Sequence, residues 1–176
     1  MDIKKIIVGQ LQTNCYLLID GGELAAVDPG DEAPRIIAEI GKTGAAVKYI
    51  INTHCHFDHI GANAALENEF GVKASANLKE GDVLAIGKSQ VSVVKTPGHT
   101  PEGICLFGAG FVISGDTLFD GGIGRTDLAG GSNKEMAASL KKLDDLIPEG
   151  AMVYPGHGDI FTYEKGAALR WIRYLE

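Results

Sequence analysis

The sequence predicts an α/β domain, and the stretch 47–70 is the first reason. Val47–Ile51 is a short β-branched apolar run that favours a buried strand, and Ala62–Phe70 is rich in Ala, Leu and Glu, which favours a helix. The loop between them contains three histidines and an aspartate within six residues. This loop leaves the carboxyl end of a strand, which is where open α/β folds collect ligands.

Length and composition favour a single globular domain. The 176 residues, 45% of them apolar and 22% charged, suit one globular domain spanning 1–176 with a sizeable core. The net charge is −7 and Lys and Arg form no run, so a nucleic-acid backbone is not an expected partner. No apolar run reaches membrane length, and the patch after Lys4 and Lys5 is too short for a signal peptide. Three cysteines without paired spacing predict reduced thiols and a cytoplasmic location.

The first forty residues predict a β-meander followed by a helix. The three strands expected from β-branched apolar runs are Ile3–Val8, Cys15–Ile19 and Leu24–Val27. Asp28-Pro29-Gly30 breaks the pattern, and on local evidence it is a plain turn. Pro34 marks a helix start and Gly41 its end.

The loop 52–61 contains the densest set of candidate metal ligands. Imidazole nitrogen and carboxylate oxygen are donors that zinc, iron and manganese accept, and the candidates are His54, His56, Asp58 and His59. Asp58 also stands where a helix N-cap would be. A capped helix with solvated histidines is the simpler interpretation, but three histidines at this spacing argue against it. Cys55 alternates with its neighbours, so we expect it to pack on the opposite side.

The second half again predicts strands that end in polar loops. The expected strands are Val72–Ala74, Val83–Ile86, Val91–Val94, Ile104–Phe107, Phe111–Ser114 and Met152–Tyr154. Two prolines stiffen the loop around His99, Asp116 follows the strand that ends at Ser114, and His157 follows the last strand.

Two helices and a glycine-rich loop complete the prediction. The loop 121–131 lacks the spacing and the lysine of a phosphate-binding loop, so we interpret it as a surface loop braced by Arg125. Asn133 is expected to cap a helix that ends near Leu146. A last helix is expected over Glu164–Leu175, with its apolar side chains inward: Leu169, Trp171, Ile172 and Leu175.

All five histidines follow predicted strands, in loops rich in Gly or Pro. With the two aspartates they make seven donors: His54, His56, Asp58, His59, His99, Asp116 and His157. A single zinc takes four ligands in a structural site and three in a catalytic one, so seven donors predict two metals that share a carboxylate. The set contains no thiolate, which favours chemistry on bound water over a closed structural site.

The order of these motifs resembles that of the metallo-β-lactamase fold superfamily, and most closely its glyoxalase II-like (hydroxyacylglutathione hydrolase-like) branch. The matching segments are Thr-His-Cys-His-Phe-Asp-His (53–59), Thr-Pro-Gly-His-Thr-Pro (96–101), Gly-Asp-Thr-Leu-Phe (115–119) and Tyr-Pro-Gly-His-Gly (154–158). Thr-Asn-Cys-Tyr (13–16), Asp-Pro-Gly (28–30) and Gly-Ile-Gly-Arg-Thr-Asp (122–127) match as well. The resemblance implies a four-layer αββα sandwich of two face-to-face β-sheets with outer helices.

The resemblance also implies a division of the donors. His54, His56 and His99 would hold a first divalent metal, Asp58, His59 and His157 a second, and Asp116 would bridge them. Zinc is the expected metal, with iron or manganese as alternatives. A hydroxide shared by the two metals would attack a carbonyl, and Asp58 would accept a proton from water.

The chain departs from this branch in three places. The region between Phe70 and Val91 is short, Glu102 stands where a glycine is usual, and the C-terminal helical extension that supplies glutathione contacts is absent before Glu176. We therefore expect a short form of the family with an open site, and leave glutathione recognition undecided.

The expected function is that of a metal-dependent hydrolase of the glyoxalase II type, acting on a small thioester. A persulfide dioxygenase with one iron is the alternative, in which His59 and His157 would hold no second metal, and a lactonase is a third possibility. A flavin-linked di-iron protein would need Glu at the position of His56 and a flavin domain. A metal-free interaction module would give no reason for seven donors in loops.

Overall fold

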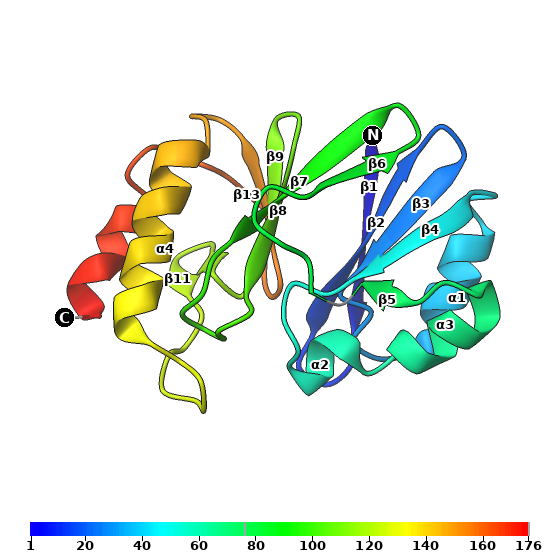
Figure 1. The fold of residues 1–176 in the computed structure, drawn as a ribbon, viewed down its shortest axis with the longest axis horizontal. Helices are drawn as coiled ribbons and strands as arrows, with labels where there is room; N and C mark the ends of the chain where they lie inside the picture. The colour runs from blue at the N-terminus through cyan, green and yellow to red at the C-terminus, as the bar shows by residue number, and fades with distance from the viewer. Residues whose placement is uncertain (76, 176) are drawn as a thin grey trace. The chain divides into compact units, whose positions relative to one another are not determined.

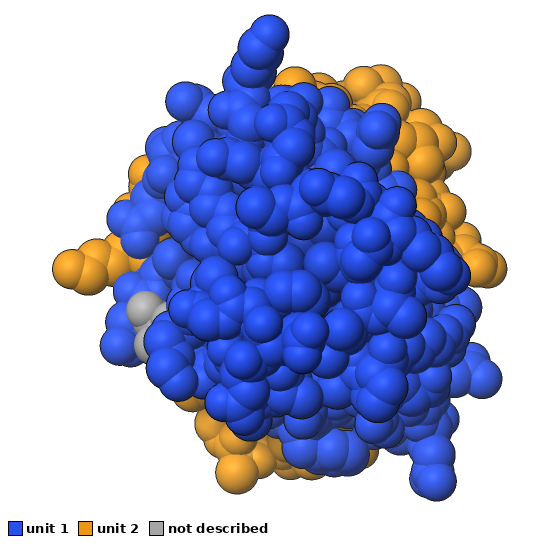
Figure 2. All heavy atoms as spheres, turned by 90° about the vertical axis from the view of Figure 1, so that its right-hand side faces the viewer, with its two compact units in different colours: residues 1–78, 82–91 blue, residues 79–81, 92–176 orange. Residues whose placement is uncertain are grey.

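The computed structural model describes residues 1–75 and 77–175 and divides into two compact units. Unit 1 comprises Met1–Leu78 and Asp82–Val91, and unit 2 comprises Lys79–Gly81 and Ser92–Glu176; Figure 2 colours them blue and orange. A single domain over 1–176 stays a prediction, and its residues Ala76 and Glu176 lie outside those described.

Unit 1 is built on a five-stranded mixed sheet with the strand order β1-β2-β3-β4-β5 (Figure 1). The first three strands pair antiparallel, which confirms the predicted meander, whereas β3, β4 and β5 run parallel. Their bounds are β1 Asp2–Val8, β2 Thr13–Asp20, β3 Glu23–Val27, β4 Ala46–Ile51 and β5 Ala74–Ser75. The strand predicted over Val72–Ala74 therefore begins two residues later than expected.

Three helices accompany this sheet: α1 Ala33–Gly41, α2 Phe57–Ile60 and α3 Asn63–Phe70. Pro34 lies in the first turn of α1, as predicted, where a proline costs no helical hydrogen bond. Ile36 and Ile40 of α1 and Leu66 of α3 are buried in one apolar cluster with side chains of β1 to β4. Burial of one helix face against the sheet thus holds the β4–α2 loop at the carboxyl end of β4.

The second sheet has six strands in the order β13-β12-β9-β8-β7-β6. Its bounds are β6 Val83–Ile86, β7 Ser89–Lys95, β8 Ile104–Gly108, β9 Phe111–Gly115, β12 Met152–Pro155 and β13 Phe161–Thr162. Strand β6 and the first three residues of β7 belong to unit 1, and the rest of the sheet to unit 2. A separate small hairpin joins β10, Leu118–Phe119, to β11, Gly122–Ile123. The sequence did not indicate β10, β11 or β13.

Two helical segments pack in unit 2, and both differ from the predictions in detail. Helix α4 spans Asn133–Leu146, but its N-cap is Ser132, whose hydroxyl accepts from the Glu135 amide. Capping by Asn133 was therefore wrong, because Asn133 already has helical geometry.

The predicted last helix is a shorter 3-10 helix, η1, over Ala168–Tyr174. Trp171, Ile172 and Leu175 pack against the core of unit 2 as expected. Leu169 does not, since it is 42% exposed. The inward orientation predicted for Leu169 was therefore wrong.

Two mixed sheets with helices confirm the predicted α/β class. Four strand ends lead into the predicted ligand loops: His54 follows β4, His99 follows β7, Asp116 follows β9 and His157 follows β12. Among the helices described, none combines the length and apolar character that crossing a membrane requires.

Candidate functional site

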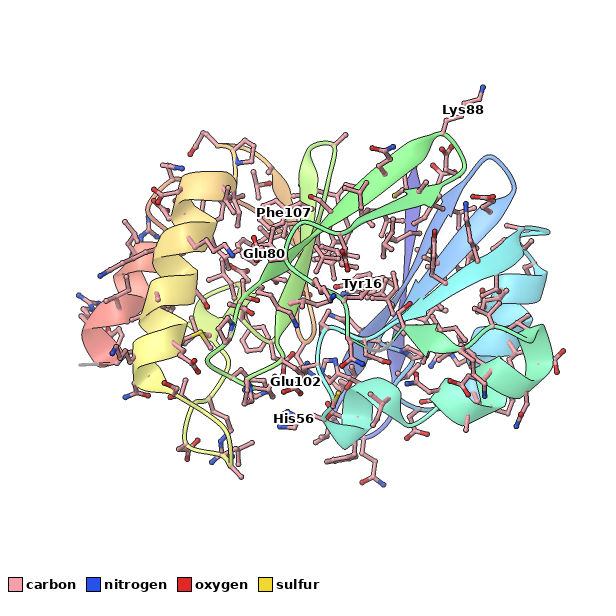
Figure 3. All side chains as sticks on the ribbon, viewed as in Figure 1. Tyr16, His56, Glu80, Lys88, Glu102 and Phe107 are labelled. Carbon is pink, nitrogen blue, oxygen red and sulfur yellow. The ribbon has the colours of Figure 1, made fainter. Side chains whose placement is uncertain are left out.

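Unit 1 brings together the four donors predicted in the loop 52–61. The Nε2 of His54 lies 3.0 Å from the Nδ1 of His56, and the rings of His54 and His59 have centroids 4.1 Å apart. The Nε2 of His59 lies 3.5 Å from the Oδ2 of Asp58. Figure 3 labels His56 in the loop that precedes α2. The short segment after β4 and the helix α2 that follows it thus direct all four side chains into one small volume.

The neighbours of His54 determine which of its nitrogens can bind a metal. The Thr53 hydroxyl donates to the Oδ2 of Asp28 at 2.7 Å, and the same Thr53 oxygen lies 3.1 Å from the Nδ1 of His54. Because the single hydroxyl proton is given to the carboxylate, the Nδ1 of His54 must be the donor to Thr53. The Nε2 lone pair of His54 is then available for a cation.

Asp28 also fixes His59, and local sequence analysis did not find this role. The fully buried Oδ2 of Asp28 lies 3.0 Å from the Nδ1 of His59, and its Oδ1 accepts from the Thr53 amide at 2.7 Å. A carboxylate that faces one ring nitrogen keeps a proton there and leaves the other nitrogen as the ligand. The plain-turn interpretation of Asp28-Pro29-Gly30 was therefore incomplete. The available signal was the Asp-Pro-Gly match to the family.

Asp58 is not a helix N-cap, contrary to the prediction. It lies in the first turn of α2, whose N-cap is His56, and the N-cap of α3 is Ala62. The Thr13 hydroxyl donates to the Oδ2 of Asp58 at 2.9 Å. This hydrogen bond stabilises the ionised carboxylate and sets its direction, which are both requirements of a metal ligand.

Two glycines let the backbone of α2 approach the turn that holds Asp28. A Cβ on Gly30 would lie 1.6 Å from the carbonyl oxygen of Asp58, and a Cβ on Gly61 would lie 2.3 Å from the carbonyl oxygen of Gly30. Neither glycine has a positive φ, so the reason for glycine here is space alone. The close approach places Asp28 behind His59.

Unit 2 brings together the other three predicted donors. The Oδ2 of Asp116 lies 3.6 Å from the Nε2 of His99 and 3.5 Å from the Nε2 of His157. One carboxylate oxygen therefore faces two imidazole nitrogens, and all three atoms are of types that bind metals. The ring of His157 also packs edge-on against Phe119, with centroids 6.2 Å apart.

The glycine-rich loop positions His99 through its backbone. The Nδ1 of His99 lies 2.7 Å from the carbonyl oxygen of Arg125, which can only accept, so Nδ1 is protonated and Nε2 is the ligand. A Cβ on Gly124 would lie 1.9 Å from the Asp116 carbonyl oxygen and 3.0 Å from Cγ of His99. The prediction of a loop braced by Arg125 holds, since Arg125 forms a two-point ion pair with Asp127 and lowers the pKa of that carboxyl to about 2.

Buried hydroxyl and thiol groups connect the strands that carry His99 and Asp116. The hydroxyl of Thr96, the residue after β7, lies 3.0 Å from the hydroxyl of Thr117 and 3.3 Å from the sulfur of Cys105. Burial raises the pKa of the Cys105 thiol to about 11, so this group stays a neutral thiol near pH 7. The network fixes the spacing of the two loops in unit 2.

The spacings between imidazole and carboxylate donors fit metal ligands better than they fit hydrogen bonds. Two ligands that are each about 2.0–2.1 Å from one tetrahedral ion are separated by about 3.3–3.4 Å. The separations of 3.5, 3.5 and 3.6 Å between imidazole nitrogens and carboxylate oxygens are within a few tenths of an ångström of that value, while the 3.0 Å between His54 and His56 also suits a hydrogen bond. Hydrogen bonds to carboxylates are shorter, at about 2.7–2.9 Å. The residues present therefore fit a metal. Whether both sets serve one dinuclear centre stays a prediction.

None of the three cysteines forms a disulfide bond, as expected. Cys15 and Cys105 are buried, and Cys55 is exposed. The packing role predicted for Cys55 was therefore wrong, because the loop 52–57 is irregular and does not alternate like a strand.

The family model of the metallo-β-lactamase superfamily matches residues 8–85 and 74–157. The chain belongs to the metallo-β-lactamase superfamily. The two matched ranges contain all seven predicted donors, and the family's fold is one that binds metal ions. Membership confirms the predicted metallo-β-lactamase fold class and makes this chain a member of a superfamily of metal-dependent hydrolases.

Two curated relatives of this superfamily member cover nearly the whole chain. A probable metallo-hydrolase, YqgX, of Bacillus subtilis is 35% identical over 92% of this chain and 94% of its own length. The hydroxyacylglutathione hydrolase GloC of Haemophilus influenzae is 30% identical over 92% of this chain and 93% of its own. Both relatives are short, like this chain.

Two solved structures are similar in fold to this chain. The BLEG-1 B3 metallo-β-lactamase has a TM-score of 0.86 and 30% identity, with 99% of both chains covered. TTHA1623 in a di-iron-bound form has a TM-score of 0.81 and 32% identity, with 90% of this chain and 94% of that chain covered. The fold is therefore shared with metal-binding proteins of the same size.

Proposed function

We propose that this superfamily member is a dinuclear metal-dependent hydrolase that cleaves small-molecule thioesters, as enzymes of the glyoxalase II type do. The observation that carries the proposal is the position of the Asp116 Oδ2, 3.6 Å from His99 and 3.5 Å from His157. In the proposed site this carboxylate oxygen contacts two ions, one on the side of each imidazole. The thioester substrate is supported by the relative from Haemophilus influenzae, a hydroxyacylglutathione hydrolase.

The proposed ligand sets take donors from both units. His54, His56 and His99 hold the first ion, Asp58, His59 and His157 hold the second, and Asp116 is shared. Unit 2 would supply two ligands to each ion: His99 and Asp116 to the first, and His157 and Asp116 to the second. A zinc site needs at least three protein ligands, so the proposal requires donors of unit 1 to complete both sets.

When bound, such metals polarise a carbonyl and bring the pKa of bound water toward about 7. The side chains of this chain prepare that chemistry. His54 and His99 each have Nδ1 hydrogen-bonded to an oxygen, and the Nδ1 of His59 lies 3.0 Å from the Asp28 carboxylate, which leaves Nε2 as the ligand in each ring. Asp58 accepts a proton from water, and its Oδ2 is held by Thr13. Hydrolysis then adds water across the C–S bond and releases a carboxylic acid and a thiol.

Zinc is the metal we propose, with iron or manganese as the alternatives. Imidazole and carboxylate donors accept all three, and the set contains no thiolate. A relative with two irons supports the alternative of iron. We also propose a cytoplasmic location, which three cysteines without a disulfide support.

The test is metal analysis of protein purified from its own host, followed by a substrate panel. The panel contains thioesters, a lactone, a persulfide and a β-lactam, each assayed with and without oxygen. We expect two metal ions per chain and thioester hydrolysis that needs no oxygen and survives exchange of the metal for zinc. Strict dependence on iron and on oxygen, with thioesters untouched, would contradict the proposal in favour of a persulfide dioxygenase.

A further inference from the structure

Unit 1 contains a cavity of about 280 Å³ that the metal ligands do not account for. Its walls come from residues 8–11 and Thr13 at the turn between β1 and β2, from Gly30 and Asp31, and from the first two residues of α2, Phe57 and Asp58. The cavity thus lies within a single unit and directly beside a predicted donor.

The character of the cavity changes from one side to the other. Val8 is buried and supplies an apolar floor, while Leu11 and Phe57 are large apolar side chains that are 53% and 74% exposed. Thr13 and Asp58, joined by their hydrogen bond of 2.9 Å, form the polar side. Phe57 directly precedes Asp58 in the chain, so the apolar wall begins one residue from the group that accepts a proton.

The wall formed by the β1–β2 connection is held in place by hydrogen bonds. The amide of Gly9 donates to Glu32 at 3.0 Å, and the amide of Gln12 donates to the carbonyl oxygen of Gly9 at 3.2 Å. Glu32 is in turn paired with Arg35 at 2.9 Å. Gly9 has a φ of +68°, which an L side chain rarely adopts. The cavity is therefore preformed, and a ligand does not have to order this loop.

The charge of the lining restricts what can bind. The charged side chains that line the cavity are two carboxylates, Asp31 and Asp58, and no Lys or Arg of the described residues lines it. Asp58 is committed to a metal in the proposed function, so Asp31 is the remaining negative charge. A carboxylate or phosphate on a ligand would be repelled there, whereas an uncharged apolar group would contact Val8, Leu11 and Phe57.

We propose that this cavity is a specificity subsite that takes an uncharged apolar arm of the thioester substrate, with Leu11 and Phe57 as its selecting residues. This inference rests on the proposed thioesterase function. The volume lies just below the roughly 300–1,000 Å³ of pockets for drug-sized ligands, so the arm is short and the remainder of the substrate lies outside. Glutathione, with its two carboxylates, is disfavoured in this subsite.

The arm can belong to the acyl group or to the leaving thiol, and two substrate series separate these sources. One series lengthens the acyl chain from acetyl to octanoyl on a fixed neutral thiol, and the other lengthens an alkyl thiol on a fixed acetyl group. In one series we expect kcat/KM to rise about two- to fourfold per methylene until the cavity is full. Flat dependence in both series would overturn the inference.

Leu11→Ser and Phe57→Ser should each reduce the rise of kcat/KM with chain length in the series that shows it. The metal content of every variant is measured as well. The matched control is Val83→Ser, an apolar side chain of unit 1 that is 56% exposed and does not line the cavity. Val83→Ser should keep the wild-type dependence on chain length. An unchanged slope in both Leu11→Ser and Phe57→Ser would also overturn the inference.

Asp31→Asn tests the charge argument without disturbing the loop. The Oδ1 of Asp31 accepts from the Glu32 amide at 2.6 Å, and an asparagine oxygen can accept in the same way. We expect kcat/KM for a carboxylate-bearing thioester to rise severalfold relative to a neutral one of equal length, with the gain shrinking at high salt. Equal effects on both substrates would contradict the charge argument.

A binding measurement separates failure of this inference from failure of the proposed function. If no thioester is hydrolysed, the proposed function fails, and the subsite is then decided by backbone NMR with the neutral probe hexanamide. Shifts at the amides of Gly9 and Gln10 that Leu11→Ser weakens would support the subsite. An absence of shifts at these amides, with metal-loaded protein and millimolar probe, would overturn it.

Discussion

The Oδ2 of Asp28 lies 3.0 Å from the Nδ1 of His59, and Asp28 has a φ of +51°. The left-handed backbone turns the carboxylate back toward the loop that follows β4. Asp and Asn are the non-glycine residues that tolerate this conformation best, so position 28 can be changed to Asn without backbone strain.

Asp28→Asn should lower metal affinity about 10–100-fold, the usual scale for losing an outer hydrogen-bond partner of a metal ligand. The amide nitrogen would present a donor to the Nδ1 of His59, which moves the imidazole proton to Nε2 and removes the ligand lone pair. Competition with a chelator measures the affinity. Unchanged affinity would show that Asp28 only supports the turn.

Asp58→Asn separates holding a metal from accepting a proton. Asn keeps the shape and an oxygen that can accept from Thr13, but it is not a base. If Asp58 accepts the proton, kcat should fall by about 10²–10⁴-fold at retained metal content. Asp58→Ala is the comparison, and it should lose metal as well. Activity that excess metal restores in both variants would assign Asp58 to metal binding alone.

Gly124→Ala should disturb His99 and Asp116 together. The new Cβ would lie 1.9 Å from the Asp116 carbonyl oxygen, and the φ of Gly124 is not positive, so the effect is steric. Overpacking of this kind costs about 1–3 kcal/mol, and we expect loss of metal as well. Gly41→Ala is the control, since a Cβ there meets nothing within 4 Å. Urea denaturation and metal content provide the measurements.

The free energy of unfolding should fall with pH above about 8.5, the pKa of a thiol in an unfolded chain. Burial raises the pKa of Cys105 to about 11, so between these values the unfolded chain loses a proton that the folded chain keeps. The stabilisation from Cys105 is fully present below that window and is lost as pH rises toward about 11. Each such group contributes a slope of about 1.4 kcal/mol per pH unit. Burial raises the pKa of the Cys15 thiol as well, so Cys105→Ala should remove one such contribution and leave that of Cys15, as urea titrations at several pH values can test.

Ser132→Ala should lower the free energy of unfolding by about 1 kcal/mol, the usual effect of losing a helix N-cap. The Ser132 hydroxyl accepts from the Glu135 amide at 3.2 Å, and no side chain of α4 replaces it. Ser132→Asp retains a good cap and should retain most of the stability. Equal loss in Ser132→Asp and Ser132→Ala would indicate a role other than capping.

Residue type and spacing were sufficient to predict which side chains of the loop 52–61 lie together. His54, His56, Asp58 and His59 lie within one short loop, so their proximity in unit 1 follows from the chain itself. The contact of Asp28 with His59 could not be predicted in the same way. It depends on the parallel pairing of β3 with β4 and on the hydrogen bond from the Asp28 amide to Ile51, which join positions far apart in sequence.

The errors at helix ends have a tertiary origin as well. Asp58 and Asn133 are good capping residues by type, but the tight turns before α2 and α4 bring each of them into the helix itself. At the C-terminus, Asp144 accepts from the amide of Gly166 and from Tyr163, which ties the segment down before η1 begins. Amphipathic spacing alone could not indicate such a constraint.

The packing of Gly30 against the Asp58 backbone has a consequence for how such an enzyme can evolve. Gly30 and Gly61 admit no side chain, while Phe57, within the same short segment, has most of its surface in solvent. Mutations at Phe57 can therefore accumulate without disturbing the backbone that holds Asp58 and His59. A gene encoding this chain could acquire a new substrate preference in single steps while keeping its metal loop intact.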